Sequence, residues 1–243
     1  MTEATPQDLR EKFSFAFQPI VDVESKRVWA YEALVRGPNG ESAYKVIEQF
    51  DEDDVHDFDV EAQNRAIRLA AKLGYQGRLM INMLNGTLRV MPDASTKAIE
   101  TALEVGMNPE HLTFEVSEKD EISDLETFLV SVRPSRQIGV DYALDDFGAG
   151  FSGLNLLAGF QPNFIKLDLW LVRDIHRNGP RQAIVRGVMR TCLDLGIEVI
   201  AEGIETNEEF YWLWQAGVRL FQGYLFARPG FETLPQPTYP SFA

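Results

Sequence analysis

From residue 78 to residue 222, short apolar segments alternate with longer segments of helical periodicity. This alternation is typical of a parallel sheet whose strands are joined by helices. The predicted strands are residues 78–84, 112–116, 141–145, 164–168, 198–201 and 219–222. The predicted helices between them are residues 96–105, 125–132, 154–158, 181–195 and 208–216.

Two further strands are predicted before this region, at residues 13–23 and 28–36, and helices at 43–50 and 54–73 follow them. Only Glu24 to Arg27 separate the two strands. A parallel crossover needs about a dozen residues or more, so these strands must be antiparallel neighbours. Eight strands in 243 residues favour one α/β domain, a (β/α)8 TIM-like barrel with its first strand antiparallel to the others. An open doubly wound sheet is the alternative.

The barrel is predicted to occupy residues 13–229, between two terminal segments. Residues 1–12 form an N-terminal extension, either a capping helix or the start of a linker. Residues 230–243 form a C-terminal tail, which we expect to be loosely attached because four prolines from Pro229 onward accompany no periodic apolar pattern.

The formal net charge of −14 argues against DNA, RNA or an anionic membrane surface as a partner, since a protein that binds any of these needs a basic surface. One cysteine, Cys192, excludes an intramolecular disulfide. Residues 1–11 do not resemble a signal peptide, and no apolar run approaches the ~18 residues of a membrane span. We therefore expect a cytoplasmic protein.

Polar side chains stand at or near the ends of seven of the predicted strands. Because the carboxyl ends of barrel strands meet at one mouth, we expect these side chains to converge there. Any one of them alone is explained equally well by a surface position or a satisfied buried group. They are Glu32, Asn82, Glu115, Asp145 with Asp146, Lys166 with Asp168, Glu202 and Gln222.

Carboxylates buried together are costly unless a cation joins them. With Lys166 included, the five acids Glu32, Glu115, Asp145, Asp146 and Glu202 carry a formal charge of −4, which two divalent ions would neutralise. Oxygen ligands favour Mg²⁺ or Mn²⁺ over zinc. Such a paired-ion site suits hydrolysis of a phosphodiester by a metal-activated water, and Lys166 would hold that water or the developing charge.

These residues resemble those of the EAL phosphodiesterase family, bacterial enzymes that hydrolyse cyclic di-GMP to linear pGpG. The resemblance covers residues 13–229 and is carried by an ordered set of motifs. They are Gln18-Pro19-Ile20, Glu32-Ala33-Leu34, Asn82, Glu115 to Glu118, Asp145-Asp146-Phe147-Gly148, Lys166-Leu167-Asp168, Ala201 to Glu205 and Gln222-Gly223-Tyr224.

The resemblance implies roles for individual residues. One ion would be held by Glu32, Asn82, Glu115 and Asp145, and the other by Asp145, Asp146 and Glu202. The predicted catalytic residues are Lys166, Glu202, Glu118 and Gln222, with Glu118 anchoring the loop from Phe147 to Leu156. The predicted substrate contacts are Gln18, Leu34, Arg36, Asp168 and Tyr224.

The resemblance also implies a homodimer, because that loop is tied to dimerisation in the family. Departures from the family pattern at Ser117, Ala149 and Phe151 remove no predicted ligand. The alternative to an active hydrolase is a non-catalytic cyclic di-GMP receptor on the same fold. An enolase-like barrel that uses Mg²⁺ and a lysine base is a third hypothesis, which the adjacent Asp145-Asp146 pair disfavours.

Overall fold

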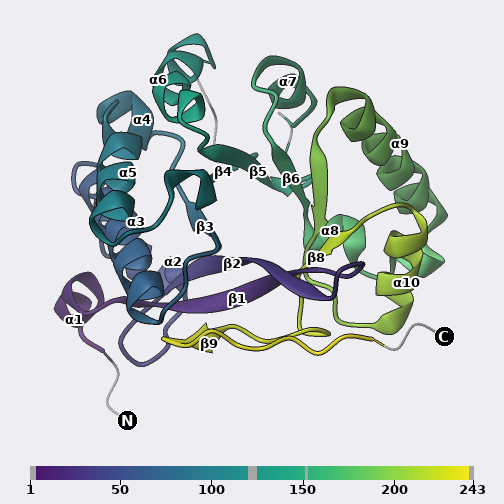
Figure 1. The fold of residues 1–243 in the computed structure, drawn as a ribbon, viewed down its shortest axis with the longest axis horizontal. Coiled ribbons are helices and arrows are strands. Elements are labelled where there is room, and N and C mark those ends of the chain that lie inside the picture. The colour runs from purple at the N-terminus through teal and green to yellow at the C-terminus, as the bar shows by residue number, and fades with distance from the viewer. Residues whose placement is uncertain (1–3, 120–124, 151–152, 241–243) are drawn as a thin grey trace.

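The computed structural model describes residues 4–119, 125–150 and 153–240. Its centre is a closed barrel in which β1 (Ser14–Asp22) pairs antiparallel with both β2 (Arg27–Arg36) and β8 (Leu220–Phe221). The strands from β2 to β8 are parallel to one another and follow their order in the sequence (Figure 1). The others are β3 (Arg78–Asn82), β4 (Leu112–Ser117), β5 (Asp141–Phe147), β6 (Phe164–Leu167) and β7 (Glu198–Ala201). The predicted barrel with an antiparallel first strand is confirmed.

Helices surround the barrel (Figure 1). The main ones are α3 (Val55–Lys72), α5 (Ala94–Glu104), α6 (Leu125–Gln137), α7 (Gly153–Gly159), α9 (Gly179–Leu195) and α10 (Asn207–Gln215). The shorter ones are α1 (Pro6–Glu11), α2 (Ala43–Ile47), α4 (Thr87–Val90), α8 (Leu169–Val172), η1 (Pro109–His111) and η2 (Ile175–Arg177).

Three helical details differ from the prediction. The helices α4 and α8 are not among the predicted helices, because each has only four residues and is too short to show a helical period. The helix α6 continues past the predicted end at residue 132 and contains Pro134, a residue that normally interrupts a helix.

The inside of the barrel consists of layers that follow from strand geometry. One layer is apolar and packs as a cluster of buried residues, one from each barrel strand except β4: Ile20, Ala30, Met80, Ala143, Phe164, Ile200 and Leu220. Side chains two residues apart on a strand share a face. Ala30, Ala143 and Leu220 are therefore followed, two positions on, by Glu32, Asp145 and Gln222 in a polar layer above.

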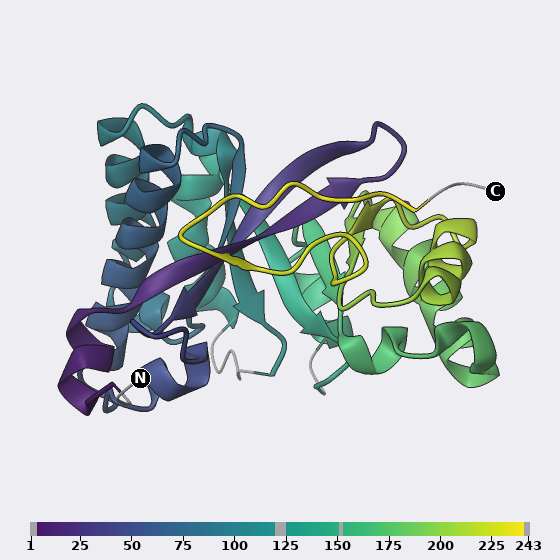
Figure 2. The ribbon, with the colours of Figure 1, turned by 90° about the horizontal axis from the view of Figure 1, so that it is seen from below.

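The C-terminal segment covers the outside of the β1–β2 hairpin, as two views show (Figures 1 and 2). No crossover helix follows β1, because β1 leads directly into β2. Instead, β9 (Gly230–Phe231) pairs with β1, and Tyr31 Oη donates a hydrogen bond to the carbonyl of Pro235. The expectation of a loosely attached tail is therefore wrong for residues 230–240.

Residues 6–11 of the N-terminal segment form the helix α1, whose N-terminus is capped. Thr5 Oγ1 accepts a hydrogen bond from the Asp8 N–H, and the Asp8 carboxylate accepts one from the Thr5 N–H. The buried side chain of Leu9 joins this helix to the core around the barrel.

Candidate active site

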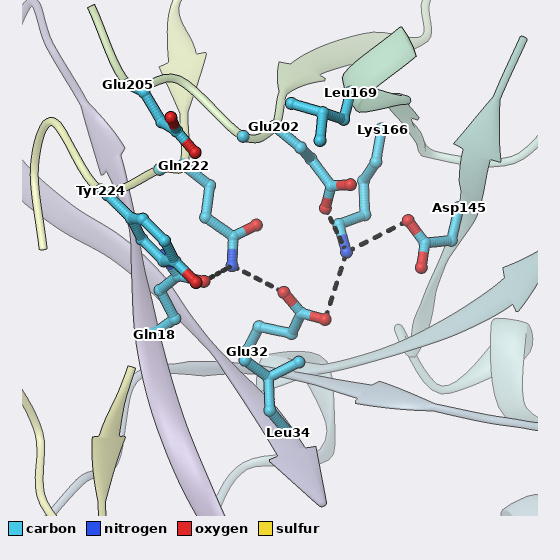
Figure 3. Close-up of a pocket in the computed structure, with 12 residues that line it drawn as sticks. Gln18, Glu32, Leu34, Asp145, Lys166, Leu169, Glu202, Glu205, Gln222 and Tyr224 are labelled. Carbon is cyan, nitrogen blue, oxygen red and sulfur yellow. Dashed lines mark hydrogen bonds and ion pairs between the residues drawn. The ribbon is translucent and has the colours of Figure 1, made fainter. Parts of the chain in front are cut away.

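The ammonium of Lys166 lies at the centre of the polar layer (Figure 3). Its Nζ atom is 2.6 Å from Glu115 Oε1 and 2.6 Å from Glu202 Oε1. It is also 3.3 Å from Asp145 Oδ1 and 3.4 Å from Glu32 Oε1. Strands β2, β4, β5 and β6 and the residue after β7 thus bring four carboxylates around one cation.

This group of side chains carries excess negative charge. Four carboxylates around one ammonium have a formal charge of −3 when all are ionised. Glu115 is 1% exposed, and within the described ranges neither of its oxygens has a hydrogen-bond partner apart from its ion pair with Lys166. A buried carboxylate in this condition is costly unless a cation or a proton compensates it.

The pKa directions reflect the same imbalance. Burial, with repulsion from Glu32, raises the pKa of Glu115 well above its usual value. Burial also raises the pKa of Asp145, and it raises that of Glu202 well above its usual value despite the attraction of Lys166. Burial opposes the charged form of Lys166, but the surrounding carboxylates raise its pKa well above the ordinary value.

Glu32 is the exception among the four carboxylates. Burial favours its neutral form, but the charge of Lys166 and a hydrogen bond from Gln222 together lower its pKa. Gln222 Nε2 donates to Glu32 Oε2 at 2.6 Å and approaches Gln18 Oε1 at 3.3 Å. Gln18 in turn donates to the carbonyl of Ala227. This network fixes one wall of the site.

A cavity of about 300 Å³ opens above these groups. Its walls include the predicted residues Gln18, Glu32, Leu34, Asp145, Lys166, Glu202, Gln222 and Tyr224. Tyr224 is 49% exposed at its edge, with the Arg228 guanidinium 4.1 Å from the ring centroid. The remaining walls come from Leu169, Gly203, Glu205 and Gly223.

The adjacent acids Asp145 and Asp146 point to different partners. Asp146 has a φ of +55°, in the left-handed region, and the pairing of β5 with β6 is irregular between Leu144 and Phe147. This turn leaves Asp145 with Lys166 and directs Asp146 Oδ1 to Lys119 Nζ at 3.0 Å. The structure therefore does not bring Asp146 into the group around Lys166.

Asp168 belongs to the same outer group as Asp146. Its Oδ2 lies 3.8 Å from Lys119 Nζ, and its Oδ1 accepts the Trp170 N–H at the start of α8. It does not line the cavity. The contact of Asp168 with substrate therefore stays a prediction.

Glu118 lies behind the acidic pair and is buried. Its carboxylate accepts hydrogen bonds from the N–H groups of Gly148 at 2.6 Å and Gly153 at 2.9 Å. These contacts tie the end of β4 to both sides of the glycine-containing loop. Within the predicted loop, Phe151 lies outside the described residues.

Two further predicted residues, Asn82 and Arg36, are not part of the cavity lining. Asn82 is exposed and stands beside Glu115 in the register of β3 and β4. Arg36 is half-buried, donates to the carbonyl of Val35 and does not line the cavity. Their roles toward metal and phosphate remain predictions.

Lys119 is the main residue at the site that sequence reasoning missed. The signal available was its place directly after Glu118, within the strand-end motif. Glu205 ends the motif from Ala201 to Glu205, for which the resemblance predicts no role at this position, and it lies in the cavity wall, paired with Arg173 at 2.7 Å.

Whether the residues suit a divalent cation depends on charge and donor type. Among the described residues, no three acidic, histidine or cysteine side chains are arranged around a common metal position. The carboxylates instead converge on Lys166. Their oxygen donors and their excess negative charge nevertheless suit Mg²⁺ or Mn²⁺, as does Glu115, whose one polar partner among the described residues is Lys166.

Comparison with known proteins gives the family. The model of the EAL domain matches residues 3–229. The chain belongs to the EAL domain family. It is 35% identical to the blue light- and temperature-regulated antirepressor BluF of Escherichia coli over 93% of this chain and 56% of BluF. It is 30% identical to the probable cyclic di-GMP phosphodiesterase PdeN of E. coli over 90% of this chain and 44% of PdeN.

A solved structure extends the similarity to a ligand complex. The manganese and cyclic di-GMP complex of Klebsiella pneumoniae BlrP1 matches with a TM-score of 0.87 and 44% identity, over 96% of this chain and 60% of that one. The EAL chain spans about half the length of the curated relatives named above. Within its described part, no helix is long and apolar enough to cross a membrane.

Proposed function

We propose that this chain hydrolyses cyclic di-GMP to linear pGpG with Mg²⁺ or Mn²⁺, two ions per site. The observation that carries the proposal is the group of four carboxylates around Lys166 at the base of an open cavity. The phosphodiesterase name of PdeN and the cyclic di-GMP and manganese in the BlrP1 complex support the same substrate and metal.

Glu32, Asn82, Glu115 and Asp145 would hold one ion, and Asp145, Asp146 and Glu202 the other. Bound divalent ions lower the pKa of water and stabilise charge on phosphate oxygens. Lys166 supplies a fixed positive charge at the base of the cavity, where it would stabilise negative charge that develops on the phosphate. In a scheme with one ion, Glu202 would instead accept a proton from the attacking water and pass it on.

The remaining polar groups position the substrate. Gln222 and Gln18 present a hydrogen-bonded wall, and Tyr224 offers an aromatic face at the cavity edge. Arg36 and Asp168 would complete the contacts with the phosphates and a base. The cavity is open to solvent on the Tyr224 side, so a dinucleotide can enter without unfolding the barrel.

The test is incubation with cyclic di-GMP and Mn²⁺, with and without chelator, followed by identification of products by mass spectrometry. We expect pGpG with metal and unchanged substrate with chelator. Glu202→Gln keeps the side-chain shape and should lose roughly 100-fold or more in turnover, the usual scale for a general base. The exposed Glu208→Gln on α10 is the matched control.

A second function is a cyclic di-GMP receptor without turnover. The observations that favour it are the name of BluF, an antirepressor, and the convergence of the carboxylates on Lys166 instead of on a metal position. The same incubation separates the two. Saturable binding of cyclic di-GMP without any pGpG, at a saturating Mn²⁺ concentration, would establish the receptor.

The assembly and location are also proposals. We propose a homodimer in the cytoplasm that binds neither DNA nor RNA polymers nor a membrane. Light scattering after size-exclusion chromatography measures the oligomeric state. A mass equal to one chain at all concentrations would rule out the dimer.

A further inference from the structure

Two lysines divide the acidic groups of the site between them. Lys166 forms ion pairs with Glu32, Glu115, Asp145 and Glu202, here called the inner group. Lys119 forms ion pairs with Asp146 and Asp168, here called the outer pair. Asp146 is one of the predicted ligands of the second ion, so an ammonium contacts a carboxylate that a divalent cation would use.

The backbone holds Lys119 in place for this contact. Its N–H donates to Ser117 Oγ at 3.1 Å, at the end of β4. The preceding residue, Glu118, donates its N–H to the carbonyl of Asp145 and binds Gly148 through its carboxylate. The contacts of Glu118 thus hold the end of β4 beside the end of β5. Lys119, the next residue, reaches Asp146 from there through its side chain.

The two lysines differ in how easily they can leave their carboxylates. The Lys166 side chain is 1% exposed and is held among four carboxylates. The Lys119 side chain is 49% exposed, and its partners Asp146 and Asp168 are 30% and 14% exposed. A flexible four-carbon stem at the surface can swing into water at little cost.

We propose that Lys119 is a built-in competitor of the second divalent cation. Its ammonium neutralises Asp146 when the outer position holds no ion, and it must swing away when an ion binds there. A divalent ion bonds a carboxylate oxygen at roughly 2.0–2.6 Å. The Lys119 ammonium, 3.0 Å from the Asp146 carboxylate, would repel a divalent ion bound to that carboxylate strongly. The inference rests on the proposed function for the identity of the outer ligands.

The consequence is that the two ions bind with unequal affinity. The inner group keeps three formal negative charges after Lys166 is counted, and these attract an ion. The outer pair, Asp146 and Asp168, keeps only one formal negative charge after Lys119 is counted. The inner ion should therefore bind first, and the outer ion only at a higher metal concentration.

The test is calorimetric titration of the metal-free protein with Mn²⁺, with free Mn²⁺ counted by electron paramagnetic resonance. Lys119→Met removes the charge and keeps most of the stem, while Lys119→Arg keeps the charge. Lys97→Met, on the outer helix α5, controls for the change in net charge. We expect Lys119→Met to tighten the weaker Mn²⁺ site about tenfold, or ~1.4 kcal/mol, and the other two variants to match the wild type.

Each other outcome has a defined meaning. If Lys119→Met binds Mn²⁺ no more tightly than Lys97→Met, or more weakly, the competitor role is wrong. If the wild type binds no Mn²⁺ at all, the proposed function falls together with the inference. If the Mn²⁺ shift appears but no pGpG is formed, the inference stands and the hydrolase fails. Circular dichroism in chelator verifies that every variant is folded.

Discussion

Lys166 Nζ lies 2.6 Å from Glu115 Oε1, and the two side chains are 1% and 0% exposed. Glu115 has no other polar partner among the described residues, so Lys166 is its sole compensation there. Three further carboxylates surround the same ammonium. The stability of the metal-free barrel should therefore depend on this lysine.

Lys166→Met should destabilise the metal-free protein strongly at alkaline pH. Removal of the cation leaves four carboxylates to repel each other, and loss of one partner of a buried ion pair costs about 3–5 kcal/mol. At pH 5 the cost should be smaller, because carboxyls with raised pKa take up protons. Urea unfolding in chelator at pH 8 and pH 5 measures both values.

The exposed Lys72→Met on α3 is the control for Lys166→Met and should change stability by less than about 0.5 kcal/mol. Equal effects of Lys166→Met at the two pH values would contradict the account, because they would mean that the carboxylates do not respond to the missing charge.

Asp59 on α3 predicts a second pH dependence, away from the polar layer. Burial raises its pKa to about 7, although Thr87, Leu84 and Gln63 donate hydrogen bonds that favour the charged form. A raised folded-state pKa stabilises the protein fully below pH ~4, and this contribution is lost as the pH rises through ~7. Asp59→Asn should remove this loss and be more stable than the wild type at pH 8, by roughly 1–3 kcal/mol.

The measurement is chemical denaturation of both proteins from pH 5 to pH 8. The exposed Asp57→Asn, on the same helix, should keep the wild-type pH dependence. Parallel stability curves for Asp59→Asn and the wild type would show that Asp59 is ionised at no cost.

Glu118→Gln should loosen the chain after the acidic pair. Glutamine has one acceptor oxygen where glutamate has two, so the N–H of Gly148 or Gly153 loses its partner. An unsatisfied buried donor costs about 1–3 kcal/mol. We expect roughly tenfold faster hydrogen exchange at one of these amides, and turnover lower by a similar factor because Asp145 and Asp146 are less well held.

The exposed Glu126→Gln on α6 is the matched variant for Glu118→Gln. Exchange rates in Glu118→Gln that equal those of Glu126→Gln would mean that the Glu118 carboxylate does not anchor the glycines.

Strand periodicity and connection length predicted most of the fold. The predicted four-residue gap from Glu24 to Arg27 required a hairpin, and the structure has one. Glu32, Asp145, Lys166 and Gln222 lie in one layer because side chains alternate along a strand and the apolar residues two positions before them face the inside of the barrel.

The rest depended on contacts between distant parts of the chain. The pattern of Asp145-Asp146 does not reveal the positive φ of Asp146, which separates the two carboxylates. Nor does it reveal Lys119 as their neighbour, since that contact depends on how β4 and β5 end side by side. The tail pairs with β1 through β9 and contacts β2 through the carbonyl of Pro235, and prolines without periodicity give no sign of such contacts.

Manganese anomalous scattering from a crystal soaked in Mn²⁺ tests the central claim most directly. We predict a peak within ~2.5 Å of carboxylate oxygens from Glu32, Glu115 and Asp145, with Glu202 turned away from Lys166 toward a second, weaker peak at Asp146. A map without a peak at the barrel mouth, in which Lys166 still contacts all four carboxylates at saturating Mn²⁺, would contradict a metal-dependent site in this protein.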